Sequence, residues 1–298
     1  MAMRITLRQL DIFRAIALTG STSAAAQSVP LSQSATSTAL GELEHNLNAL
    51  LFDRVGKRLL LNDNGRALLP MALAVLDGAR NIEMAFASND QGLTVNLRLF
   101  ASTTLGNYIL PKLLSQFRHS VPTAQLDVRI GNTLDVVTAV KEFSADLGFI
   151  EGPCHEPDIS IRPWFEDELV IVAAPAHPLA NAKLTIKQLR EAPWLLREPG
   201  SGTREAVELA LLPHVVNIQP AMTLGSSEAI KNLVAEGLGV SCLSRSVVQD
   251  LLSAGGLCVL KTTLPRLLRR TSIIHHRSKL LSQPLRNFMR HCEAYRGT

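Results

Sequence analysis

One predicted helix carries a cluster of short hydrogen-bonding side chains at its leading end. Residues 32–47 repeat apolar side chains at helical spacing, so that one face of the helix can pack in a core. Its core positions are Ala35, Leu40, Leu43 and Leu47, and its exposed polar positions are Ser32, Gln33, Ser34, Thr36, Ser37 and Thr38. Hydroxyl and amide groups at the start of a helix suit contacts with base edges and phosphates in a DNA major groove. We therefore predict a recognition helix, whereas the polar face taken alone also fits a solvated surface helix.

A short basic hairpin is predicted directly after this helix. Residues 51–62 have the pattern of two short strands, and their basic side chains are Arg54, Lys57 and Arg58. Such cations would meet phosphates or the minor groove beside the duplex. Core packing does not explain a polar helix followed by a basic hairpin, so the pair favours DNA binding over a plain surface helix.

Two further helices and a tight turn must position the predicted recognition helix. Residues 7–19 repeat apolar side chains at helical spacing and end at Gly20, and Ser21 or Thr22 can cap the next helix. Pro30 makes the following turn, because proline disfavours helical geometry in the residue before it. The order of elements over residues 1–64 predicts an all-α winged helix-turn-helix domain.

A long amphipathic helix is predicted over residues 65–88, followed by a hinge at residues 89–92. Its apolar residues recur at spacings of four and three, which is the heptad seam of two packed helices. The seam consists of Leu68, Ala72, Val75, Ala79, Ile82 and Phe86. An ordinary helix packed on its own domain is the alternative. Beside a DNA-reading module we favour a dimerisation helix, because a two-fold dimer presents two recognition helices to two half-sites.

From residue 93 onward, predicted strands and helices alternate. This alternation indicates parallel strands covered by helices, an α/β arrangement that binds ligands at the carboxyl ends of its strands. The predicted effector domain spans residues 93–298 in two lobes. Lobe I covers about 93–166 and 265–298, and lobe II covers about 167–264.

Three strand-to-helix junctions of this domain present hydroxyls and backbone N–H groups at helix starts. Helix N-termini attract negative charge through unpaired N–H groups and the helix dipole. The candidate effector-binding residues are Ser102, Thr103 and Thr104 at the first junction, Arg197, Ser201, Gly202, Thr203 and Arg204 at the second, Ser226 and Ser227 at the third, and Glu151 after another strand. Facing one cleft, these groups would bind a small oxyanion or carboxylate. Each hydroxyl taken alone could equally be a helix cap.

The last forty or so residues are rich in arginine and lysine, with Glu293 as their counter-charge. We interpret this set mainly as a solvated basic face of the effector domain. Its members are Lys261, Arg266, Arg269, Arg270, Arg277, Lys279, Arg286, Arg290 and Arg296.

Several classes of site are not supported by the sequence. The cysteines are widely separated, at Cys154, Cys242, Cys258 and Cys292, so no metal site, redox dithiol or cofactor is predicted. No nucleophile triad or phosphate loop is apparent, which argues against an enzyme on the same two-lobed fold. No apolar run could cross a bilayer and no secretory signal begins the chain, which predicts a cytoplasmic protein without membrane contact. Cys154 beside His155 leaves a redox-sensing thiol open as an alternative.

The whole chain resembles the LysR-type transcriptional regulators. The resemblance begins with the residues of the predicted winged helix-turn-helix and continues in the expected order through the linker helix and the effector domain. The family's usual leucine-threonine-x-alanine-glycine phrase after the wing departs here at Asn62 and Asn64. Asn62 can cap the next helix as threonine would, so we expect no loss of function. The resemblance implies an effector domain like that of periplasmic binding proteins, a homodimer or tetramer, double-stranded promoter DNA as partner, and contact with RNA polymerase.

Within that family, several phrases are similar to one subgroup. They are Phe-Asp-Arg-Val-Gly-Lys-Arg-Leu, Gly-Asn-Tyr-Ile-Leu-Pro, Gly-Phe-Ile-Glu-Gly-Pro-Cys-His, Gly-Ser-Gly-Thr-Arg-Glu and Ser-Glu-Ala-Ile-Lys. Regulators of this subgroup are linked to sulphur assimilation and the response to sulphite. The resemblance thus implies sulphite or a related sulphur oxyanion as effector, with an organic acid as the alternative.

Overall fold

Two compact units make up the chain. The computed structural model describes residues 4–56, 58–86, 95–180, 183–214 and 218–296. One unit comprises residues 1–94 with 278–280, and the other comprises residues 95–277 with 281–298. The predicted hinge at residues 89–92 lies outside the described residues.

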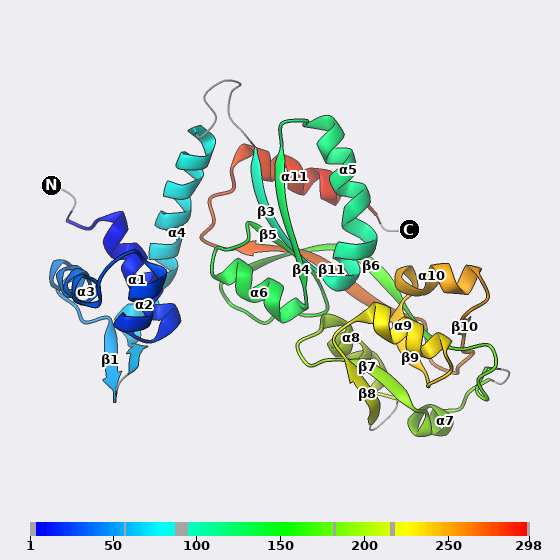
Figure 1. Ribbon diagram of the computed structural model, residues 1–298. Helices are drawn as coiled ribbons and strands as arrows, with labels where there is room; N and C mark the ends of the chain where they lie inside the picture. The colour runs from blue at the N-terminus through cyan, green and yellow to red at the C-terminus, as the bar shows by residue number, and fades with distance from the viewer. Residues whose placement is uncertain (1–3, 57, 87–94, 181–182, 215–217, 297–298) are drawn as a thin grey trace. The chain divides into compact units, whose positions relative to one another are not determined.

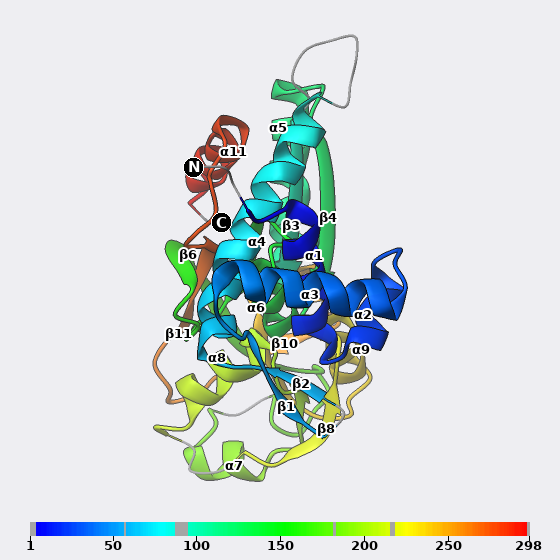
Figure 2. The same ribbon diagram turned by 90° about the vertical axis from the view of Figure 1, so that its left-hand side faces the viewer.

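The first unit contains the helices and the hairpin predicted for DNA binding. Its elements are α1 (Leu7–Thr19), α2 (Thr22–Ser28), α3 (Gln33–Leu47), β1 (Phe52–Val55), β2 (Arg58–Leu61) and α4 (Asp63–Phe86), as labelled in Figure 1. Ser21 caps α2 and Ser32 caps α3, because each side chain accepts a backbone N–H of the first turn. Phe13, Ile16 and Leu43 are fully buried and hold the helices together. The β1–β2 hairpin projects beyond α3 (Figure 2).

The second unit is built on a seven-stranded sheet in the described part of the chain. The strands of the main path follow the order β10 (Cys258–Val259), β6 (Ile159–Ala173), β11 (Leu267–His276), β5 (Leu147–Glu151), β3 (Asn96–Ser102) and β4 (Gln125–Gly131), and β9 (Ser241–Ser244) pairs with β6. A second sheet pairs β7 (Trp194–Arg197) with β8 (Pro220–Leu224) in parallel. In α/β domains, ligands bind at the carboxyl ends of the parallel strands, where the sequence predicts the effector site.

Two long antiparallel strands, β6 and β11, run between two lobes of this unit (Figure 1). In the first lobe β11 pairs with β5, and in the second lobe β6 pairs with β9. The helices of the first lobe are η1 (Leu105–Ile109), α5 (Leu110–Ser120), α6 (Thr133–Lys141) and α11 (Gln283–Glu293). Those of the second lobe are α7 (Ile186–Glu191), α8 (Gly202–Leu211), α9 (Ser227–Ala235) and α10 (Arg245–Ser253). A two-lobed α/β architecture is therefore present.

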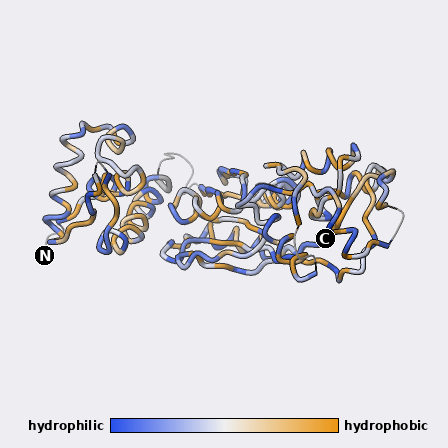
Figure 3. The backbone as a smooth tube through the Cα atoms, turned by 90° about the horizontal axis from the view of Figure 1, so that it is seen from below, coloured by the Kyte–Doolittle hydropathy of each residue, from blue (hydrophilic) through white to orange (hydrophobic). Residues whose placement is uncertain are grey.

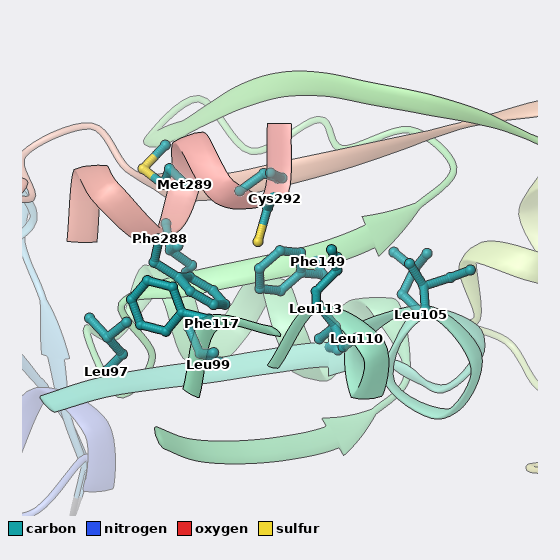
Figure 4. Close-up of a cluster of buried hydrophobic side chains, with 14 of the residues drawn as sticks. Leu97, Leu99, Leu105, Leu110, Leu113, Phe117, Phe149, Phe288, Met289 and Cys292 are labelled. Carbon is teal, nitrogen blue, oxygen red and sulfur yellow. The ribbon is translucent and has the colours of Figure 1, made fainter. Parts of the chain in front are cut away.

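Each lobe has apolar cores that fix the strand ends. In the first lobe, α5 and α11 bring Phe117 and Phe288 together, with their ring centroids 4.8 Å apart, over the buried Phe149 of β5 (Figure 4). A separate cluster joins α6 to the sheet through Val136 and Val140.

Hydrophobic and hydrophilic residues are interspersed along the chain (Figure 3). No helix among the described residues is long and apolar enough to cross a membrane.

Candidate functional site

The predicted strand-to-helix junctions meet where the two lobes face each other. Arg197, the last residue of β7, is buried, and its Nη1 donates to Thr103 Oγ1 at 3.0 Å and to Ser227 Oγ at 2.8 Å. Its Nε and Nη2 bind both carboxylate oxygens of Glu198. Arg197 thus joins the end of β3 in one lobe to the start of α9 in the other.

A second buried group surrounds Arg269, which comes from the crossing strand β11. Arg269 Nη1 donates to Thr203 Oγ1 at 2.8 Å and lies 3.6 Å from Glu151 Oε1. Its Nε donates to Asp167 Oδ2 at 2.7 Å. The Ser102 hydroxyl donates to the other oxygen of Glu151. The ends of β3, β5 and β11 and the start of α8 are therefore connected through polar side chains.

The two lobes approach each other closely at Gly202. Its backbone N–H donates to Thr133 Oγ1 at 3.1 Å. A Cβ at this position would overlap the carbonyl oxygen of Glu151. A neighbouring backbone bond runs from Leu134 N–H to the Gly200 oxygen, at 3.1 Å. Glycine is required at 202 because the start of α8 lies directly against the end of β5.

Burial controls the electrostatics of the polar cluster around Arg269. The Glu151 carboxyl has a raised pKa because burial penalises its charged form, and the nearby Arg269 guanidinium opposes that effect. Within the described residues, Nη2 of Arg269 is buried without a hydrogen-bond acceptor. The buried Thr104 hydroxyl lies beside the Glu151 carboxyl without a hydrogen bond of ordinary geometry. The buried cluster therefore holds donors that an additional acceptor would satisfy.

The structure brings together most of the residues predicted for an effector site, but not all of them. Those that meet are Ser102, Thr103, Thr104, Glu151, Arg197, Gly202, Thr203 and Ser227. Ser201 and Ser226 accept the N–H groups of Arg204 and Ala229, so both hydroxyls act as helix caps. The Arg204 side chain pairs with Glu208 and donates to the Arg197 carbonyl oxygen at 3.2 Å. None of the described hydrogen bonds of these three side chains reaches Glu151 or Arg269.

The interpretation of the C-terminal basic residues as a solvated face was wrong for Lys279, which is buried and pairs with Asp77 at 2.6 Å, and for Arg269. The Arg269 side chain is only 2 % exposed, and it pairs with Asp167 and Glu151. The alternation of buried and exposed residues along Leu267, Leu268 and Arg269 places the arginine on the inner face of β11. That period-two pattern was the signal that could have identified it.

The recognition helix presents its predicted polar face, with one exception. Ser32, Gln33, Ser34, Ser37 and Thr38 are exposed on α3. Thr36 is instead fully buried, and its hydroxyl donates to the Ser32 carbonyl oxygen at 3.0 Å. The prediction of an exposed Thr36 was wrong because 36, 40 and 43 lie on one helical stripe, and the internal hydrogen bond allows the hydroxyl to be buried.

The hairpin carries its basic side chains in the open. Arg54 and Arg58 are exposed, and Val55 pairs with Arg58 across the turn. Gly56 adopts a φ of 63°, the left-handed geometry that a tight hairpin turn needs. Lys57 lies outside the described residues.

The predicted seam of the linker helix α4 is packed against its own unit at some positions and exposed at others. Ala72 is buried in the core of its own unit, and Leu68 packs against that core. Val75 and Ile82 are exposed, and Ala79 is half-buried. The Phe86 side chain lies outside the described residues. Ala72 is therefore buried by its own unit, which contradicts its place in a dimer seam, whereas a dimer contact through the exposed positions stays a prediction.

The cysteines and histidines do not form a second chemical centre in the described part of the chain. No group of histidine, cysteine, aspartate and glutamate side chains there could hold a metal ion. Burial raises the pKa of the Cys154 thiol, and the neighbouring Glu156 and Glu205 carboxylates raise it further. His275 and His276 are buried in β11, where His275 Nδ1 lies 2.9 Å from the His276 carbonyl oxygen.

Comparison with known proteins decides the family. Residues 7–66 match the family described as bacterial regulatory helix-turn-helix protein, lysR family. Residues 90–296 match the LysR substrate binding domain. This chain belongs to the LysR-type transcriptional regulators. The helix-turn-helix unit is accordingly its DNA-binding module and the two-lobed unit its effector-binding domain.

Individual relatives agree with this LysR-type assignment over nearly the whole length. The chain is 50 % identical over 291 residues to the HTH-type transcriptional regulator YeiE of Escherichia coli (strain K12), covering 98 % of both chains. The structure of a full-length OxyR variant from Pseudomonas aeruginosa superimposes with a TM-score of 0.66 at 26 % identity, covering 98 % of this chain and 95 % of that one. The CcmR regulatory domain of Synechocystis PCC6803 in complex with 2-PG has a TM-score of 0.61 at 30 % identity, covering 67 % of this chain and 97 % of that one.

Proposed function

We propose that this LysR-type regulator binds a small oxyanion between its lobes, and that sulphite is that anion. The observation that carries the proposal is Arg269 Nη2, a buried guanidinium donor without an acceptor among the described residues. A buried donor that stays unpaired costs free energy, and a bound oxyanion would remove that cost with a charge-assisted hydrogen bond.

The surrounding side chains support a compact, polar ligand. Ser102 and Thr203 are buried hydroxyls from opposite lobes, and both already touch the Glu151–Arg269 pair. The contact at Gly202 leaves little room between α8 and β5. The hydroxyl and guanidinium donors of this cluster suit a small oxyanion better than a ligand with a large apolar body.

Contacts from both lobes also explain how binding could regulate DNA recognition. A ligand held by Ser102 on one side and Thr203 on the other stabilises the closed arrangement of the lobes over an open one. We propose that this shift alters how a dimer presents its two α3 helices to a partly palindromic promoter site. Gln33 and its exposed neighbours would read base edges, while Arg54, Lys57 and Arg58 would contact the DNA backbone.

Two alternatives are less well supported by the geometry. A redox sensor needs a thiol whose pKa is lowered, whereas burial and two nearby carboxylates raise the pKa of Cys154. An organic acid remains the nearest rival effector, and the CcmR regulatory domain, solved in complex with 2-PG, shows that a relative takes another ligand. The same buried donors would receive the carboxylate of such an acid.

The regulatory claim can be tested with DNA selected from a random pool by the full-length protein. Affinity for the selected sequence is measured with and without sulphite in wild type, Ser102→Ala and Ser120→Ala. Ser120 is an exposed serine of α5 and serves as the matched control. We expect sulphite to change the DNA affinity of wild type and Ser120→Ala but not of Ser102→Ala. An equal response in all three proteins would contradict the proposed site.

A further inference from the structure

A hollow lies on the effector-binding unit, on one face of the strands β6 and β11 that join its two lobes. It has a volume of about 520 Å³ and is bounded by β6, β11, α8 and the loop after β5. Its lining includes Ile161 and Pro163 of β6 and Leu268 of β11. Arg269 is shared with the anion cleft, but the rest of the lining is different. Cavities of about 300–1,000 Å³ are the usual size for small-molecule sites.

Apolar surface dominates this hollow. Ile161, Leu209 and Leu268 are large hydrophobic residues that line it, and they remain 42 %, 59 % and 43 % exposed. The neighbouring α8 residues, Ala206 and Ala210, are small and leave room beside Leu209. Several exposed hydrophobic side chains grouped in one concave site favour a ligand with an apolar body.

Positive charge lies at the same site. Arg270 lines the hollow and is exposed, and it forms no ion pair with any residue that the structure describes. Ser272 follows on the same strand and also lines the hollow. Its lining contains no aspartate or glutamate from the described residues. A carboxylate would therefore be attracted by Arg270 and could accept a hydrogen bond from Ser272.

We propose that this hollow binds a small monocarboxylate with an apolar tail, as a second ligand distinct from the cleft anion. The carboxylate pairs with the Arg270 guanidinium and accepts the Ser272 hydroxyl. The tail covers Leu209, Ile161 and Leu268. An arginine beside apolar walls suits a carboxylate that carries an apolar tail. The polar side chains around Arg269 suit an inorganic oxyanion instead.

The test uses hexanoate as the probe and hexanamide as its uncharged counterpart, titrated calorimetrically into the full-length protein. We expect saturable binding of hexanoate and at least about tenfold weaker binding of hexanamide, because the amide loses the charge-assisted contact. Arg270→Gln and Leu209→Glu should each weaken hexanoate binding by about tenfold or more. Arg286→Gln, an exposed arginine of α11, is the matched control.

Alkylation of Cys154 gives a second measurement that needs no substitution. Cys154 lines the hollow, whereas Cys258 does not. Hexanoate should slow the reaction of iodoacetamide with Cys154 and leave the rate at Cys258 unchanged, as followed by mass spectrometry. Thr203→Val, which alters the anion cleft, should keep its hexanoate affinity.

Each contrary result overturns the assignment. Absence of saturable hexanoate binding, or unchanged affinity in both Arg270→Gln and Leu209→Glu, would remove the site. Equal affinity for hexanamide would exclude a carboxylate-specific ligand. Loss of binding in Thr203→Val alone would place hexanoate in the anion cleft. A change in sedimentation with Leu209→Glu, without hexanoate binding to wild type, would mean that a second copy of the chain covers the hollow.

Discussion

Oε1 of Glu151 lies 3.6 Å from Nη1 of Arg269, and both side chains are only 2 % exposed. Asp167 competes for the same guanidinium, because Arg269 Nε donates to it at 2.7 Å. Two carboxyls and one arginine therefore share a buried site that also contains Ser102 and Thr203. An added anion would compete with Glu151 for Arg269, which makes the protonation of Glu151 central to the site.

Glu151→Gln should make the stability of the effector domain less dependent on pH. Burial raises the pKa of Glu151 from 4.5, so the folded state holds this proton at pH values where the unfolded chain has lost it. Between pH 4.5 and the raised pKa, the contribution of Glu151 to the free energy of unfolding therefore decreases as pH rises. Glutamine cannot titrate. We therefore expect the free energy of unfolding of the variant, relative to that of wild type, to increase across this window and then level off.

Urea denaturation of the full-length protein at a series of pH values measures this effect. Glu142→Gln is the matched control, because Glu142 is exposed. The difference in free energy of unfolding between Glu151→Gln and wild type could instead stay constant with pH. That result would show that Glu151 does not bind its proton more tightly in the folded state than in the unfolded state.

Gln33→Ala and Arg58→Ala should affect DNA binding in different ways. Gln33 is exposed at the start of α3, so its loss should relax base preference by about 1–3 kcal/mol at the contacted position. Arg58 is exposed in the hairpin, so its loss should weaken binding to all sequences and reduce the slope of affinity against salt by about one. Fluorescence anisotropy with selected and random duplexes separates the effects. Equal losses on both duplexes for Gln33→Ala would remove Gln33 from the base-reading residues.

Thr36→Ala should destabilise the DNA-binding unit instead of changing its sequence preference. The Thr36 side chain is fully buried and its hydroxyl bonds to Ser32, so its removal should cost about 1–2 kcal/mol. Thr38→Ala, an exposed threonine of the same helix, should change stability by less than about 0.5 kcal/mol. Hydrogen exchange of the α3 amides measures both values. Equal protection in Thr36→Ala and wild type would contradict a structural role for this residue.

Ile82→Glu should dissociate a dimer formed through the linker helix. Met71, Val75 and Ile82 form an exposed apolar stripe on α4, with exposures of 65 %, 49 % and 65 %. A charge buried against a second copy of this stripe should weaken dimerisation by more than about tenfold. Sedimentation velocity should show a larger monomer fraction, while Glu83→Gln, an exposed neighbour, should behave as wild type. An unchanged dimer in Ile82→Glu would move the interface to another surface.

Local patterns made much of this fold predictable from the sequence. The apolar stripe of α3, its Ser32 cap and the following hairpin depend on residues close together in the chain, so periodicity and turn residues identify them. The strand-to-helix junctions are local as well. The junctions after β7 and β8 lie side by side because those two strands are parallel. The junction after β3 belongs to another sheet and reaches them only through the antiparallel strands β6 and β11, which local patterns do not reveal.

Long-range pairing and helix faces were harder to predict. Arg269 reaches Glu151 only because β11 returns to lie beside β5, and a cluster of basic residues does not reveal that return. Thr36 looked exposed because it is polar, although its hydroxyl is satisfied within the helix. On α4, apolar residues cover several faces, so spacing alone could not separate Ala72 in the core from Ile82 on the surface.

Calorimetric titration of the full-length protein with sulphite, sulphate, thiosulphate and small carboxylates tests the central claim most directly. We predict saturable binding of sulphite to wild type and to Thr223→Val, an exposed threonine of β8. Thr203→Val should weaken that binding by about tenfold or more, and Thr203→Ser, which keeps the hydroxyl, should restore most of it. Failure of every anion to bind, or equal sulphite affinity in Thr203→Val and wild type, would contradict an oxyanion site at Arg269.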